Sequence, residues 1–236
     1  MDFQAHRWAR LGERCGVRGE VNFESGVAGC SDSTPEEIRA CAIWATTESA
    51  SRDCDWVTPR PLVELAVQVM GGIDLDPASS NFAQRNVRAA EYYTPARDGL
   101  SLPWFGRVWL CPPNGRASMP AFTAKLIHEY CAGRVVEAVA LVPNAGDTRW
   151  FHRLAGLRFP VCYVRGRINF ESHSGKKSTP PNGHSVFYLG NRQDVFKNVF
   201  SHIGRVWISE EDSSEMAAVC AADRAKIASR ALAPQA

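Results

Sequence analysis

An almost entirely apolar segment, residues 135–142, follows an amphipathic segment, residues 119–131, that ends before Gly133. The amphipathic segment has its apolar residues at helical spacing. The apolar segment is typical of a central parallel strand that is buried on both faces. Because such a strand needs neighbouring strands and a helix layer over each face, these two segments predict an α/β fold.

The same alternation of helix and strand continues on both sides of these segments. Further helices are expected at residues 62–70, which Gly71 and Gly72 end, and at residues 148–154. Strands are expected at residues 73–76, 107–110, 161–164, 167–170, 185–189 and 206–208. This order predicts a mostly parallel sheet with helices on both faces.

Both ends of the chain differ from this pattern. Residues 1–53 are predicted to be an amino-terminal appendage with one helix, which begins at Thr34, and a linker. Residues 210–236 are rich in Ala and are predicted to be a helical or frayed tail. The α/β domain itself is expected to span residues 54–209.

Composition excludes several classes of protein. The 236 residues carry 27 Lys and Arg against 25 Asp and Glu, which is too balanced for a histone-like protein that binds DNA by charge alone. No apolar run approaches the roughly 18 residues of a membrane span, and no signal-peptide pattern begins the chain, so a cytoplasmic location is expected. The eight Cys include no C-x-x-C pair, so no metal is expected.

Two of the predicted strands end in sequences that can do chemistry. Residues 74–77 (DLDP) offer carboxylates that can accept hydrogen bonds from ribose hydroxyls or an amino group. No glycine-rich turn follows them, which favours a cofactor without a pyrophosphate. Residues 111–114 (CPPN) begin with a rigid turn whose carbonyls point outward as acceptors. Each sequence is also compatible with an ordinary turn, but ligands of α/β sheets bind at the carboxyl ends of strands.

Seven short motifs stand in a fixed order between about residues 55 and 190. They are DWVTP at 55–59, GIDLDPAS at 72–79, YYT at 92–94, DGL at 98–100, GRVWL at 106–110, TRWF at 148–151 and GRINF at 166–170. In this order they resemble the phage and prophage DNA adenine methyltransferases (Dam-like), which use S-adenosylmethionine. The resemblance implies a compact Rossmann-like class I methyltransferase fold. It also implies an enzyme that methylates double-stranded DNA in a bacterial host cell, as in restriction–modification.

The resemblance further implies a role for each matched position. The implied cofactor-binding residues are Thr58, Pro59, Asp74, Asp76, Pro77 and Asp98. The implied catalytic residues are Cys111, Pro112, Pro113 and Asn114. A target adenine would flip out of the duplex and reach the double-proline turn. Acceptors there would hold the amine protons and free the nitrogen lone pair for the sulfonium methyl group.

Two positions of this tetrad depart from the family's pattern of Asn, Asp or Ser, then Pro-Pro and an aromatic residue. Cys111 is a weaker acceptor than the usual side chain, unless a lowered pKa makes it a thiolate. Asn114 lacks the aromatic ring that stacks on the base, a contact that contributes ~1–3 kcal/mol, although Trp109, Phe122 or Trp150 could stack instead. We therefore expect a weakened or retargeted enzyme. The alternative is a catalytically silent remnant of the same fold that binds nucleic acid or cofactor.

A basic group of residues with an aromatic neighbour is the candidate DNA-binding surface. Its members are Arg149, Trp150, Arg165, Arg167, Lys176 and Lys177. Basic side chains would contact phosphates, and the indole would face a base. The same residues are equally typical of an ordinary solvated loop.

Overall fold

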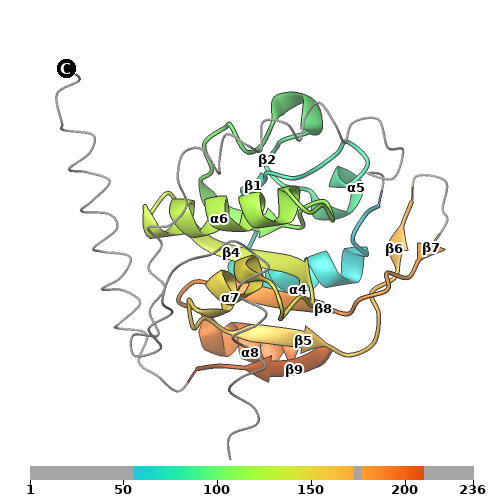
Figure 1. The fold of residues 1–236 in the computed structure, drawn as a ribbon, viewed down its shortest axis with the longest axis vertical. Helices are drawn as coiled ribbons and strands as arrows, with labels where there is room; N and C mark the ends of the chain where they lie inside the picture. Colours follow the sequence, from blue (N-terminus) through green and yellow to red (C-terminus); the bar gives the residue numbers. More distant parts are fainter. Residues whose placement is uncertain (1–55, 173–176, 210–236) are drawn as a thin grey trace, which may run out of the picture.

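The computed structural model describes residues 56–172 and 177–209 (Figure 1). The predicted appendage at residues 1–53, the predicted tail at residues 210–236 and Lys176 lie outside the described residues. Within these two described ranges, no helix has both the length and the apolar character that crossing a membrane requires.

Seven strands form one sheet in the order β2-β1-β3-β4-β8-β5-β9. Their bounds in that order are Glu91–Tyr92, Leu75–Asp76, Gly106–Leu110, Val135–Pro143, His184–Leu189, Val161–Val164 and Gly204–Trp207. The first four strands of the sheet are parallel to one another. Strand β8 is antiparallel to β4 and β5, and β9 is antiparallel to β5. Five strands therefore share one direction, which confirms the predicted mostly parallel sheet.

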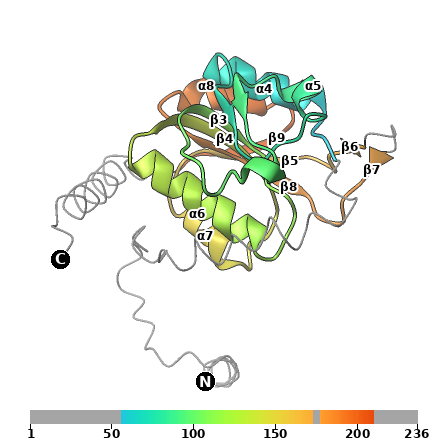
Figure 2. The same cartoon turned by 90° about the horizontal axis from the view of Figure 1, so that it is seen from above.

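Helices cover both faces of the sheet, as predicted (Figure 2). Helices α6 (Ser118–Cys131) and α7 (Arg149–Ala155) lie over one face, and α4 (Arg60–Met70) and α8 (Gln193–Phe200) lie over the other. Each face has its own apolar cluster, here called the α6 cluster and the α4 cluster. The result is a three-layer α/β/α arrangement.

Strand β4 shows why its sequence is apolar at nearly every position. Ala138, Ala140 and Val142 belong to the α6 cluster. Val139 and Leu141, at the alternate positions, belong to the α4 cluster. Because successive side chains of a strand point to opposite faces, a strand that is covered on both sides needs apolar residues at both sets of positions.

Helix α4 ends where the sequence predicted. Gly71 adopts a left-handed conformation with φ of 76°, and its N–H donates to the carbonyl of Val67 at 2.7 Å. This is the usual glycine cap of a helix C-terminus. The helix therefore runs from the Thr58-Pro59 segment at one edge of the sheet to Met70 at the other edge.

The prediction of a sheet strand at residues 167–170 is wrong. Strand β6 (Phe170–Glu171) pairs with β7 (Lys177–Ser178) in a separate two-stranded sheet. Gly166, with φ of 77°, turns the chain after β5 and so separates this hairpin from the main sheet. Strand β2, helix α5 (Gln84–Val87), the 3₁₀ turn η3 (Pro95–Arg97) and helix α8 were not predicted.

Candidate functional site

The two predicted site segments meet at one edge of the sheet. Strand β1 pairs in parallel with β2 on one side and with β3 on the other, with Leu75 opposite Val108. The chain order therefore reverses at β1, which is the topological switch point where α/β sheets bind their ligands. Asp76 ends β1 and Cys111 follows β3 at this same edge.

Asp76 is a buried carboxylate without a cationic partner. Its side chain is 2% exposed, and it accepts hydrogen bonds from the Ala78 N–H at 3.3 Å and from Gln84 Nε2 at 3.0 Å. Burial raises its pKa to about 6, while hydrogen bonds from Ser79, Ala78 and Gln84 act against this rise. Among the described residues, no Lys, Arg or His forms an ion pair with it.

Gln84 is a site residue that the sequence analysis missed. Besides Asp76, its Nε2 contacts Ser79 Oγ at 2.7 Å, and its carbonyl accepts from the Ala89 N–H at 2.9 Å. The glutamine therefore fixes the orientation of the Asp76 carboxylate. It lies on the short helix α5, for which the sequence carries no strong helical pattern, so nothing linked it to the strand end.

Thr58 connects the start of helix α4 to the double-proline turn. Its hydroxyl donates to Cys111 Sγ at 3.5 Å, and its carbonyl accepts from Asn86 Nδ2 at 2.9 Å. Thr58 is buried, and Pro59 directly precedes helix α4. The structure therefore brings the Thr58-Pro59 segment next to Cys111.

The thiol of Cys111 is neutral at physiological pH. Burial raises its pKa to about 11; the hydrogen bond from Thr58 acts against this rise, and the negative charge of Asp76 adds to it. A thiolate, which would be the better acceptor, is therefore disfavoured at this position. The influence of Asp76 on this pKa also shows that the two strand ends lie within electrostatic range of each other.

The carbonyls of the double-proline turn differ in their partners. The Pro113 carbonyl accepts from the Gly115 N–H at 2.9 Å and from Ser118 Oγ at 3.0 Å. The Pro112 carbonyl accepts no hydrogen bond from residues 56–172 or 177–209. Pro112 thus retains an acceptor for a ligand, whereas Asn114, next in the chain, is exposed.

The Asp98-Gly99 segment packs directly against the end of β1. A Cβ atom on Gly99 would lie only 1.9 Å from the Pro77 carbonyl oxygen, so only glycine allows this approach. Asp98 adopts a left-handed conformation, with φ of 45°, and its Oδ1 accepts from the Leu100 N–H at 3.2 Å. The structure therefore brings the Asp98-Gly99 segment next to Pro77, the residue that follows Asp76.

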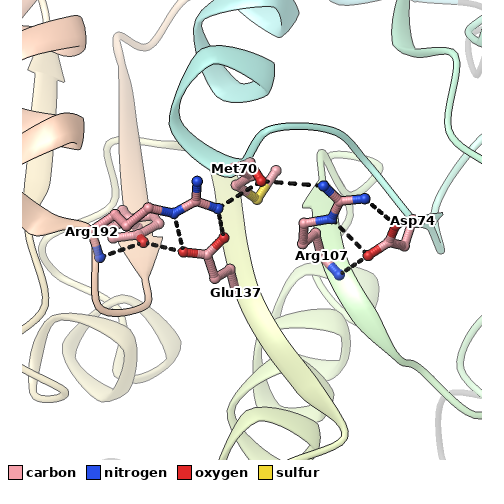
Figure 3. A network of polar contacts seen from close by, with 6 residues as sticks. Met70, Asp74, Arg107, Glu137 and Arg192 are labelled. Atoms are coloured by element: carbon pink, nitrogen blue, oxygen red, sulfur yellow. Dashed lines mark hydrogen bonds and ion pairs between the residues drawn. The ribbon is translucent and has the colours of Figure 1, made fainter.

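Asp74 is not part of this group. It precedes β1, and its carboxylate binds the Arg107 guanidinium through Oδ1 at 2.6 Å and through Oδ2 at 2.8 Å (Figure 3). The hydrogen bond from Arg107 holds its pKa below the ordinary value. Because Arg107 lies near the start of β3, Asp74 belongs to the amino end of the strands, away from the double-proline turn.

The candidate DNA-binding residues follow the carboxyl ends of two strands. Arg149 is exposed at the start of α7, after β4, and Arg165 and Arg167 are exposed after β5, which runs in the same direction as β4. Lys177 is exposed in β7. Trp150 is half-buried and meets Phe151 edge-on, with ring centroids 5.6 Å apart.

The prediction that Trp109 or Phe122 could stack on the base in place of the missing aromatic residue is wrong. Trp109 is 1% exposed and Phe122 is 0% exposed, because each lies inside one of the two apolar clusters. Of the three candidates, only Trp150 keeps an accessible face. Within the described ranges, no three His, Cys, Asp or Glu side chains gather closely enough to hold a metal ion.

The fold and the site define an α/β protein whose polar residues converge at the switch point of a mostly parallel sheet. The model of the DNA N-6-adenine-methyltransferase (Dam) family matches residues 45–189, more than half of the chain, and the protein belongs to this family. The family resemblance seen in the sequence is thereby confirmed. No curated protein and no solved structure matches the chain.

Proposed function

We propose that this protein transfers a methyl group from S-adenosylmethionine to the exocyclic amine of an adenine in double-stranded DNA. The observation that carries the proposal is the adjacency of Asp76 and the Cys111-Pro112-Pro113 turn in a member of this family. The strand order around β1 and β3 supports the finer assignment to the Rossmann-like class I methyltransferase fold.

The chemistry of Asp76 fits the proposed cofactor. S-adenosylmethionine carries a sulfonium and an ammonium group, and Asp76 is a buried carboxylate with no cationic partner among the described residues. Thr58, Pro59, Pro77 and Asp98 would complete the site, since their segments pack around the same strand end. Asp74 is left out, because Arg107 already binds both of its oxygens.

The Pro112 carbonyl would hold the target amine. It accepts from the amine N–H and draws the nitrogen toward tetrahedral geometry, so that its lone pair faces the methyl donor. When bound, the cofactor would supply an electrophilic methyl group to the amine nitrogen in exchange for an amine proton, which would pass to water. A base in a duplex reaches this turn only by flipping out of the stack.

Cys111 and Asn114 weaken this chemistry. A neutral thiol that already accepts a hydrogen bond from Thr58 is a poor second acceptor for the amine. Asn114 provides no ring for stacking. These two features also favour the second candidate function, a protein that binds cofactor and DNA without methyl transfer.

DNA would approach the carboxyl edge of the sheet. Arg149, Arg165, Arg167 and Lys177 are exposed there or in the adjoining hairpin, and Lys176 precedes Lys177 in the chain. We assign these side chains to phosphate contacts and Trp150 to the face of a base.

The test is methyl transfer from labelled S-adenosylmethionine to unmodified DNA, followed by mass analysis of the nucleosides. We expect N6-methyladenine from the wild type, and a loss of ten- to a hundredfold in Asp76→Asn, the effect of losing a charged hydrogen bond. Asp194→Asn, an exposed site on α8, is the matched control and should match the wild type. Cofactor binding without any labelled base would support the silent protein, and methylated cytosine would contradict the proposal.

A further inference from the structure

His184, the first residue of β8, holds a buried polar atom with no partner. The side chain is 2% exposed, and its Nδ1 makes no hydrogen bond within the described part of the chain. No other fully buried side-chain nitrogen or oxygen in that part is unpaired. Because buried polar atoms are almost always hydrogen-bonded in native proteins, an unpaired one calls for an explanation.

The imidazole lies at the same edge and on the same face of the sheet as the double-proline turn. His184 is opposite Pro143 at the carboxyl end of β4, and β4 is the neighbour of β3. Val186, two residues further along β8, belongs to the α4 cluster, against which Cys111 also packs. Since side chains two residues apart share a face, His184 points to the Cys111 side of the sheet.

A chain of contacts joins His184 to the proposed cofactor segment. Its ring lies 5.3 Å from that of Phe170, measured between centroids. The next residue, Glu171, exchanges two backbone hydrogen bonds with Val57, at 2.8 and 3.1 Å. Val57 precedes Thr58, whose hydroxyl contacts the Cys111 thiol. His184 therefore lies on the border of the proposed site, and it is not part of the catalytic tetrad.

The electrostatic surroundings keep this imidazole uncharged. Burial lowers its pKa to about 4, and the positive charge of Arg167 lowers it further. A neutral imidazole has one N–H and one lone pair, so it suits a neutral ligand group and gives no ion pair to a phosphate.

We propose that His184 recognises the flipped adenine by donating a hydrogen bond from Nδ1 to a ring nitrogen of the base. This inference rests on the proposed function and adds a residue that distinguishes one base from another. One amine N–H of adenine is assigned to the Pro112 carbonyl, so the ring nitrogens remain as acceptors for another donor. A donor aimed at N1 of a purine accepts adenine and rejects guanine, whose N1 carries a hydrogen.

Two substitutions of His184 distinguish the role of its polar atom from the role of its packing. His184→Asn keeps an N–H near the position of Nδ1, whereas His184→Leu has almost the same shape and no polar atom. We expect His184→Leu to lower kcat/KM for DNA about three- to tenfold, as one neutral hydrogen bond requires, with an unchanged KM for S-adenosylmethionine. His184→Asn should retain most of the activity. In our proposal His184→Leu has a higher melting temperature than the wild type but a lower kcat/KM. A purely structural role predicts the opposite relation, in which a variant with a higher melting temperature does not lose activity.

Modified DNA identifies the contacted atom. The target adenine is replaced in turn by 1-deaza-, 3-deaza- and 7-deazaadenine, and each substrate is assayed with the wild type and with His184→Leu. We expect one analogue to cost the wild type three- to tenfold and to cost the Leu variant nothing further. If the Leu variant does not fold, His184→Gln takes its place, since its amide lies near Nε2 and should not rescue the contact.

Two results would overturn the inference, and only the second would also overturn the proposed function. Equal kcat/KM values for the wild type and folded His184→Leu, or equal analogue effects in both, would refute the role of His184 alone. Absence of methyl transfer by the wild type to any DNA would refute the proposed function and this inference with it.

Discussion

Replacing Asp76 by Asn should have opposite effects on stability and on cofactor binding. The pKa of Asp76 is about 6, against 3.8 for an ordinary Asp carboxyl group. Between pH 3.8 and about 6, the Asp76 carboxyl group has lost its proton in the unfolded chain but keeps it in the folded protein. The free energy of unfolding therefore falls as pH rises. At about 1.4 kcal/mol per pH unit, the loss reaches roughly 3 kcal/mol at pH 7.

Asp76→Asn removes this loss because the amide does not ionise. The new Nδ2 would meet the Gln84 amide nitrogen, which cancels part of the gain. We therefore expect the variant to be about 1–3 kcal/mol more stable than the wild type at pH 7 and no more stable below pH 4. Thermal and urea unfolding at both pH values measure this difference.

Cofactor binding should depend on the same ionisation, but it should strengthen as pH rises, whereas the free energy of unfolding falls. The wild type should bind S-adenosylmethionine up to about tenfold more weakly for each pH unit below 6, because protonation removes the charge of Asp76. His184, with a pKa of about 4, stays neutral between pH 5 and 7, so it does not interfere. Calorimetric titration of both proteins at pH 5, 6 and 7 tests the slope. A wild-type Kd that is constant over this range, or an equal slope in Asp76→Asn, would refute the reasoning.

Three further substitutions test other parts of the site. Gly99→Ala should destabilise the protein by several kcal/mol in urea unfolding and abolish cofactor binding, because its Cβ would lie 1.9 Å from the Pro77 carbonyl oxygen; Gly146→Ala, with nothing within 4 Å, is the neutral control. Cys111→Asn combined with Asn114→Tyr should raise DNA methylation by about ten- to a hundredfold, and unchanged labelling would contradict our account of the tetrad. Lys176→Glu with Lys177→Glu should weaken DNA binding and lower the slope of log K against log salt by about 2, whereas an unaltered salt titration would remove both lysines from the DNA surface.

The sequence predicted those parts of the fold that local pattern determines. Helices α6 and α4 each carry an apolar periodicity, strand β4 is a long apolar run, and Gly71 marks the end of α4. Strand β2 and helix α5 are two and four residues long. Elements this short exist only because the rest of the fold holds them, so no local pattern could have revealed them.

The candidate site could be predicted only in part, for a similar reason. The motifs marked Asp76 and the double-proline turn, and parallel pairing of β1 with β3 brings them together. Motif matching could not separate Asp74 from Asp76, because the partner of Asp74 is Arg107, which lies 33 residues away in the chain. Gln84 and His184 belong to no motif, and only their burial and contacts identify them.

The two edges of the sheet differ in how their polar groups are satisfied, and this difference indicates where a ligand binds. At the amino edge, Arg107 and Arg192 pair with Asp74 and Glu137, and both guanidinium groups also donate to the Met70 carbonyl at the end of α4 (Figure 3). At the carboxyl edge, the Asp76 carboxylate has no cation, and neither the Pro112 carbonyl nor His184 Nδ1 has a partner within the described part of the chain. Burying an unpaired polar atom or a carboxylate without a cation lowers stability, so a fold that retains two unpaired atoms and one such carboxylate at one edge is suited to a ligand with complementary groups. A cationic methyl donor would neutralise the carboxylate, and an adenine would supply both an amine donor for Pro112 and a ring acceptor for His184.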